Sequence, residues 1–230
     1  MAAKPASDTA YGRAYAAGRA AQRQVLLDAA SQLLETEGPE ALTMRRIAGA
    51  VGCSTSVLYS MFGGKAGVAE ALWREGFERL HAALAAVEDG EPLDRLAAMG
   101  QAYRRSALAN RSYYGVMFAR PIPGFDPSPE AYEASLRPLG LLTDVVAACV
   151  DAGVFRLVDP AHAARVLWAA SHGAVSLELA GYEGAVDAEA CYEDLLAGAA
   201  SWFFAPPSAA SDIHQDDHHE EGDRREDRNR

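Results

Sequence analysis

Apolar residues recur along most of the chain with the three- and four-residue spacing of amphipathic helices. The first clear run begins at Ala21 and stops at Gly38 and Pro39, residue types that end helices. No segment alternates between apolar and polar residues as a strand does, so we predict an all-α fold of about nine helices. Later runs cover residues 65–87, 93–110, 113–118 and 129–152, one begins at Pro160, and the last covers 187–204.

Two short helices are expected within residues 43–65, which read TMRRIAGAVGCSTSVLYSMFGGK. Ala48 allows two helices to approach closely, and Gly52, four residues later, suits a tight turn with positive φ. This pattern predicts a helix-turn-helix, although an ordinary pair of antiparallel helices could share the apolar spacing. The inward positions hold Ile47, Val51, Cys53, Leu58 and Met61, and the outward positions of the second helix hold Ser54, Thr55, Ser56, Tyr59 and Ser60. Short hydroxyl side chains of this kind suit base edges and phosphates.

Composition sets the expected limits of the domains. Residues 1–20 are rich in alanine and glycine with scattered basic residues, and we expect a flexible arm. Residues 21–66 then form the helix-turn-helix domain and residues 67–205 a larger helical domain. Residues 212–230 are acidic and contain one aliphatic residue, Ile213, so a disordered tail is predicted over residues 206–230. The tail histidines could hold a transition metal weakly, but a solvated tail is the favoured interpretation: His214, His218 and His219.

The formal net charge of −11 argues against nucleic acid only until its distribution is considered. Residues 1–65 carry seven basic and five acidic side chains, so the negative charge lies in the rest of the chain. Binding to phosphates depends on the local field at the contact, and a mildly basic N-terminal part is compatible with DNA. No apolar run is long enough to span a membrane and no signal peptide is evident, so a cytoplasmic protein is expected. The three cysteines are far apart and give no zinc motif.

Residues 22–73 resemble the DNA-binding domain of the tetracycline-repressor (TetR) family of bacterial regulators. The matching positions are Gly38, Thr43, Ile47, Ala48, Gly52, Ser54, Leu58, Tyr59, Phe62 and Lys65. The resemblance implies that Thr43 and Lys65 bind phosphate, that Thr55 and Ser56 face base edges, and that Tyr59 reaches the backbone or a thymine methyl group. The expected DNA contacts are Thr43, Arg45, Ser54, Thr55, Ser56, Tyr59, Ser60 and Lys65. This sequence departs from the family at Cys53, Met61 and the pair Gly63 and Gly64, and these glycines leave the phosphate contacts near Lys65 in doubt.

The run Leu167 to Gly173 resembles the Trp-His-Gly (WHG) signature of one C-terminal domain class of the same family, and residues 117–124 resemble that class too. The alternative is that His172 is an ordinary core histidine beside Trp168. The family implies a small-molecule effector, a homodimer and a palindromic operator in double-stranded DNA. The expected effector pocket is Tyr103, Tyr113, Tyr114, Met117, Phe118, Trp168 and His172. The expected dimer interface is Leu167, Leu179, Leu195, Ala199, Trp202 and Phe203.

Two other classes of function are weaker. No HExxH or GxSxG motif is present, and we expect neither an enzyme nor a cofactor. Glu75, Glu78 and His81 share a helix face like the ligands of a carboxylate metal site, but a solvated face is favoured and no metal is predicted. The second alternative is a ligand-binding or adaptor dimer without DNA binding, which the hydroxyl face of residues 54–60 disfavours.

Overall fold

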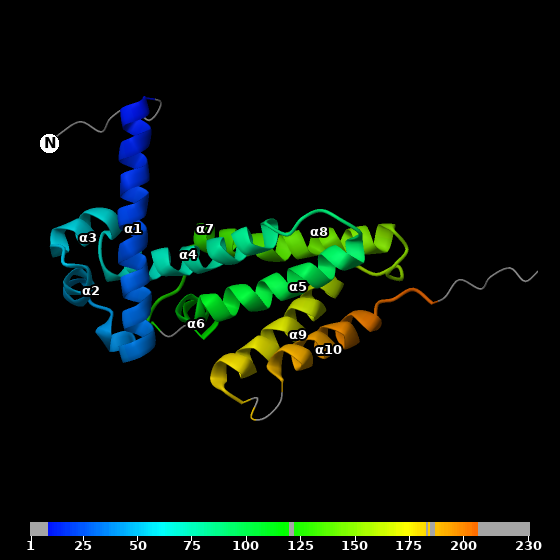
Figure 1. Ribbon diagram of the computed structural model, residues 1–230. Coiled ribbons are helices and arrows are strands. Elements are labelled where there is room, and N and C mark those ends of the chain that lie inside the picture. The colour runs from blue at the N-terminus through cyan, green and yellow to red at the C-terminus, as the bar shows by residue number, and fades with distance from the viewer. Residues whose placement is uncertain (1–8, 120–121, 183, 185–186, 207–230) are drawn as a thin grey trace, which may run out of the picture.

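The computed structural model describes residues 9–119, 122–182, 184 and 187–206. The described residues form ten α-helices and one short 3-10 helix, and their one β-type contact is an isolated bridge between Phe155 and Phe204. The predicted all-α fold is therefore confirmed. Helices α1 to α3 form one compact unit, the head, and α4 leads from it into a bundle of α5 to α10, the body (Figure 1).

The head contains α1 (Ala10–Glu37), the 3-10 helix (Pro39–Ala41), α2 (Met44–Val51) and α3 (Thr55–Phe62). Helix α4 covers Lys65–Ala85. The body contains α5 (Pro92–Ala109), α6 (Arg111–Ala119), α7 (Pro129–Ser135), α8 (Arg137–Asp151), α9 (Pro160–Ala180) and α10 (Ala188–Ser201).

Helix α1 begins at Ala10, so the expectation of an arm over residues 1–20 is wrong for residues 10–20. Alanine is the strongest helix former, and this segment forms a helix through propensity although it buries no apolar face. The hydroxyl of Thr9 caps the helix by accepting a hydrogen bond from the amide of Gly12 at 2.9 Å. Residues 1–8 and the predicted tail from residue 207 lie outside the described residues.

The predicted helix over residues 129–152 is two helices, which accounts for ten helices where about nine were expected. Pro138 lies in the first turn of α8. Proline fixes φ and its ring clashes with the carbonyl group four residues earlier, so a helix cannot run through this position without a break. Helix α7 accordingly ends at Ser135 and α8 begins at Arg137.

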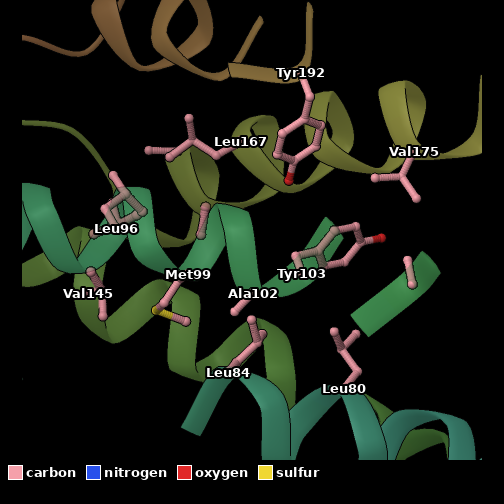
Figure 2. Close-up of a cluster of buried hydrophobic side chains, with 14 of the residues drawn as sticks. Leu80, Leu84, Leu96, Met99, Ala102, Tyr103, Val145, Leu167, Val175 and Tyr192 are labelled. Atoms are coloured by element: carbon pink, nitrogen blue, oxygen red, sulfur yellow. The ribbon is translucent and has the colours of Figure 1, made fainter. Parts of the chain in front are cut away.

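Two hydrophobic clusters share α4. Its N-terminal half contributes Val68 and Leu72 to the cluster of the head, and its C-terminal half contributes Leu80 and Leu84 to the cluster of the body. Figure 2 shows the body cluster, in which side chains from α4, α5, α8, α9 and α10 face one another. One helix therefore lies in both clusters and joins the head to the body.

Candidate nucleic-acid interface and internal cavity

The turn between α2 and α3 is fixed by Gly52. Its backbone has φ 70°, in the left-handed region that glycine adopts without cost, and it ends α2. The amide of Cys53 donates to the carbonyl of Ala48 at 3.0 Å. Behind the turn, Ile47 and Leu58 are buried in the cluster of the head. Helix α3 is therefore held by its inner side while its outer side faces solvent.

All eight predicted DNA contacts are exposed, and they lie on α3, at its N-cap and at the starts of α2 and α4. The Tyr59 side chain is 55% exposed. The hydroxyls of Ser54 and Ser56 form a hydrogen bond of 2.7 Å at the start of α3. Thr43 caps α2 by accepting from the amide of Arg46, whose guanidinium pairs with Glu37 of α1. The arrangement gives a short helix whose outer surface consists mainly of hydroxyl groups, next to the basic side chains of Arg45 and Lys65.

The corner between α3 and α4 is an ordered turn. Gly63 has φ 74° and ends α3 by donating its amide to the carbonyl of Tyr59 at 2.9 Å. Lys65 then begins α4. The two glycines that depart from the family pattern therefore supply the backbone conformation of a helix end, which a residue with a side chain would adopt only under strain.

The body encloses a cavity of about 940 Å³. Four residues predicted for an effector pocket line it: Tyr103, Met117, Phe118 and Trp168. The largest part of the cavity lining comes from α4 and α5, and apart from Tyr103 these residues were not predicted from the sequence. The continuous apolar face of residues 68–84 was a signal for those on α4. These missed residues are Trp73, Phe77, Leu80, Leu84, Leu93, Leu96 and Met99, and several appear in Figure 2. The lining is chiefly aliphatic and aromatic, with a few polar groups such as Gln101, Arg165 and Glu193.

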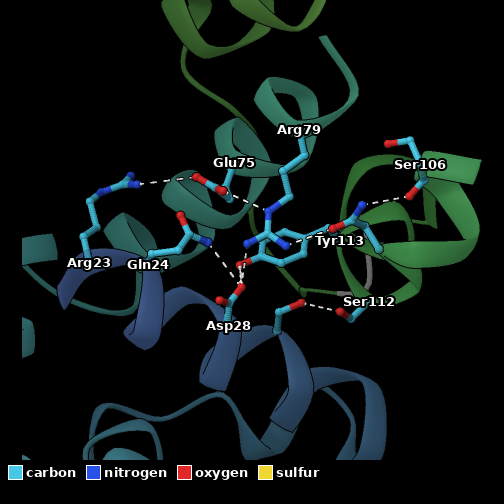
Figure 3. Close-up of polar contacts among 10 residues, drawn as sticks. Arg23, Gln24, Asp28, Glu75, Arg79, Ser106, Ser112 and Tyr113 are labelled. Carbon is cyan, nitrogen blue, oxygen red and sulfur yellow. Dashed lines mark hydrogen bonds and ion pairs between the residues drawn. The ribbon is translucent and has the colours of Figure 1, made fainter. Parts of the chain in front are cut away.

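Tyr113 does not line the cavity, so its assignment to the pocket was wrong. It lies at the junction of head and body, where its hydroxyl donates to Asp28 of α1 at 2.9 Å (Figure 3). The Arg79 guanidinium lies over its ring at 4.1 Å and donates to Asp28 and to Glu75. Burial and the Asp28 carboxylate raise the pKa of Tyr113. Neighbouring residues on a helix point in different directions, and this one faces the head.

Tyr114 and His172 also lie outside the residues that line the cavity. The Tyr114 hydroxyl and Nδ1 of His172 form a hydrogen bond of 2.7 Å, and the Tyr103 hydroxyl is 3.2 Å from that of Tyr114. Burial lowers the pKa of His172 and so favours the neutral ring. The half-buried His172 thus belongs to a polar network with Tyr103 and Tyr114, and of these three residues Tyr103 lines the cavity.

Glu75, Glu78 and His81, the three residues with metal-site spacing, interact with arginine side chains. Glu75 pairs with Arg79 at 2.9 Å, and Glu78 pairs with Arg137 at 2.8 Å. Arg137 also donates to Nε2 of His81 at 3.2 Å. Within the described ranges, no three His, Cys, Asp or Glu side chains come together in a way that could hold a metal ion.

Helices α9 and α10 carry apolar side chains on their outer faces. Of the predicted interface residues, Leu195 is 42% and Trp202 is 74% exposed, while Leu179 and Ala199 are half-buried. Leu167 and Phe203 are buried within the chain and cannot touch a partner, so their assignment to the interface was wrong. Both belong to the body cluster, where Leu167 lines the cavity and Phe203 packs on Phe155. Further exposed small or apolar residues on the same faces are Val166, Ala169, Gly173, Leu177, Cys191 and Gly198.

Two family models match the chain. Residues 26–72 match bacterial regulatory proteins of the tetR family, and residues 96–199 match a tetracyclin repressor-like C-terminal domain. Because the second match carries this general description, the Trp-His-Gly subtype stays a prediction. Within the part of the chain that the structure describes, no helix combines the length and apolar character needed to cross a membrane.

Individual relatives agree with these matches. An uncharacterized HTH-type transcriptional regulator of Mycobacterium tuberculosis is 27% identical over 206 residues, which are 85% of this chain and 91% of the relative. A protein with unknown function from Rhodococcus sp. RHA1 is 26% identical with a TM-score of 0.70, over 80% of this chain and 95% of that one. The TetR family transcriptional regulator PfmR from Thermus thermophilus is 26% identical with a TM-score of 0.62, over 74% and 96%.

Proposed function

Because the chain belongs to the TetR family of DNA-binding transcriptional regulators, we propose that it represses transcription from a palindromic operator and releases the DNA when a small, largely apolar effector binds in the body. It acts in the cytoplasm, where bacterial DNA lies. The observation that carries the proposal is the outer surface of α3, where five hydroxyl side chains are exposed on a helix braced from behind.

The hydroxyl face enters the major groove of the operator. Thr55 and Ser56 at the start of α3 face base edges, and Tyr59, one turn further, contacts the backbone or a thymine methyl group. Lys65 and Arg45 supply positive charge to the phosphates on either side of the groove. Ser54, Ser60 and Thr43 complete the contacts at the edges of this surface.

A homodimer presents two heads to the two half-sites. The outer faces of α9 and α10 supply the interface, because Leu195 and Trp202 are exposed apolar side chains beside the small residues Gly173 and Gly198, which allow helices to approach closely. Leu195→Asp with Trp202→Asp is expected to give monomers in analytical ultracentrifugation. A variant that sedimented as the wild-type dimer would place the interface elsewhere.

Helix α4 couples the effector to DNA. Lys65 at its start lies beside the DNA-facing surface, while Trp73, Phe77 and Leu80 line the cavity. A ligand that fits one tilt of α4 better than another changes the distance between the two heads, and its differential affinity for the two states sets the size of the response. A difference of about 3 kcal/mol would lower operator affinity about 150-fold.

The test is fluorescence anisotropy of the protein with DNA that flanks its own gene, measured at two salt concentrations. We expect tight binding that weakens steeply with salt, because phosphate contacts release counterions. Tyr59→Ala with Lys65→Ala should abolish this binding while the melting temperature stays unchanged, because both side chains are exposed. Weak binding that is indifferent to salt and to these substitutions would instead favour the adaptor alternative.

A further inference from the structure

The N-terminal part of α1 packs against almost nothing in the described structure. Residues 10–22 are exposed at every position except Gly12, and this part of the helix projects beyond α2 and α3 (Figure 1). Most helical stability in proteins comes from packing an apolar face, which this segment lacks. Most of the surface of the projecting segment is therefore open to a partner.

One face of the projecting segment combines aromatic and basic side chains. Tyr11, Tyr15, Arg19 and Arg23 follow one another at four-residue intervals, so they form a single row along the helix, the Tyr-Arg row. Tyr11 is 71% and Tyr15 is 42% exposed. No acidic residue occurs between residues 9 and 27, in a chain whose net charge is −11. The row is thus a local basic surface on an acidic protein, and its charge suits a polyanion.

The contacts of Arg23 show where the Tyr-Arg row begins. Its guanidinium lies 5.7 Å from the ring centre of Phe62, the last residue of α3, and 3.9 Å from Glu75 of α4. The row therefore starts beside the corner where α3 ends and Lys65 begins α4. From Arg23 to Tyr11 the helix rises about 18 Å, at about 1.5 Å per residue. That length matches about five phosphates along one DNA strand.

We propose that the Tyr-Arg row is a second DNA-contacting surface, which binds the sugar–phosphate backbone of the duplex just outside the half-site read by α3. This inference rests on the proposed function and extends it. Arg19 supplies a charged contact to a phosphate, and the hydroxyls of Tyr15 and Tyr11 donate hydrogen bonds to phosphate oxygens. Arg23 is already engaged by Glu75 and Phe62 and orients the row. The contacts carry no sequence information, so they raise affinity without changing the operator sequence.

The experiment compares two duplexes by anisotropy with the full chain. One duplex is trimmed to the two half-sites, and the other adds about ten base pairs of arbitrary sequence at each end. Wild-type protein should bind the longer duplex about tenfold more tightly. In Arg19→Ala this advantage should disappear. The slope of log affinity against log salt concentration on the longer duplex should also become shallower by about 1.8. Each phosphate contact contributes about 0.9 to this slope, and the dimer loses two such contacts. Tyr15→Ala should lose part of the advantage.

The controls separate this inference from the proposed function. Arg105→Ala makes the same charge change on an exposed position of α5 and should bind both duplexes as wild type. Arg19→Lys keeps the charge and should keep the salt dependence. Alanine favours the helix, and circular dichroism verifies that α1 persists. The second surface alone is overturned if wild-type binding is independent of duplex length. It is also overturned if Arg19→Ala behaves as wild type or weakens binding equally on both duplexes. Failure of wild-type protein to bind either duplex overturns the proposed function too.

Discussion

The head and the body hold their candidate functional side chains in opposite ways. In the head, the five hydroxyl residues lie on one short helix or at its N-cap and are exposed, and the buried residues behind them only hold α3 in place: Ser54, Thr55, Ser56, Tyr59 and Ser60. In the body, the side chains that line the cavity come from seven helices and point inward. The head is therefore sensitive to the position of one helix, while the body is sensitive to how its interior is filled.

Helix α4 is where these two kinds of surface meet, and disturbing its first turn tests the comparison most severely. A Cβ atom added at Gly67 would collide with the backbone carbonyl of Phe62, so α3 or α4 has to move. We expect Gly67→Ala to lower operator affinity about 100-fold or more, because misplacing α3 costs several base and phosphate contacts, each mismatch being worth about 1–3 kcal/mol. Binding of the apolar dye Nile red in the cavity should stay unchanged.

The matched control for this variant is Gly140→Ala on α8, where a Cβ atom meets no neighbouring atom within 4 Å. This change should stabilise the helix by about 0.5–1 kcal/mol and leave both binding activities intact. If Gly67→Ala bound the operator as wild type, the corner between α3 and α4 would be compliant and α4 could not transmit a tilt to the head.

The second test fills the cavity of the body with a tryptophan and leaves the head unchanged. Leu142 of α8 lines the cavity and is half-buried. Leu142→Trp should weaken Nile red binding about tenfold, since space in an apolar pocket is worth about 1–3 kcal/mol per group, while operator affinity in the absence of ligand stays the same. The measurements are dye fluorescence and anisotropy. A parallel loss of DNA binding would show that the two regions do not act separately.

The same contrast explains what could be predicted from the sequence. The exposed face of α3 follows from local spacing, because the five hydroxyl residues are nearly consecutive and the inward positions between them are apolar. Two aromatic residues of α6 look alike in the sequence, yet Tyr113 faces the head and Phe118 faces the cavity. Apolar residues of α9 and α10 likewise do not reveal whether they pack within the chain, as Leu167 does, or stay exposed, as Leu195 does. These choices depend on helix packing over long distances in the chain. The start of α1 was not predicted because its alanine-rich residues favour a helix by propensity but show no apolar periodicity.

Ion pairs in the body and in the head should differ in how much they contribute to stability. Arg104 and Glu178 of the body form a bidentate pair at 2.6 and 2.8 Å, with side chains only 11% and 14% exposed. Glu178→Gln should cost about 2 kcal/mol, because it removes the bidentate carboxylate and leaves only the exposed Glu189, 3.4 Å away, to pair with the guanidinium. The same change at Glu37, which pairs with Arg46 on the exposed surface of the head, should cost less than about 1 kcal/mol. Equal shifts in denaturant midpoint for the two variants would contradict this difference.

The smallest expected effect concerns the pH response of the body. Burial lowers the pKa of His172, so at a pH below its ordinary value of about 6.5 the unfolded chain binds a proton that the folded chain resists. Stability from this group is therefore present above pH 6.5 and is lost as the pH falls toward the lowered pKa. Thermal melts from pH 7.5 to 5 should show a smaller loss of stability for His172→Gln than for wild type, while the exposed control His162→Gln should follow wild type. An identical pH profile for His172→Gln and wild type would mean that the histidine is protonated in the fold as readily as in water.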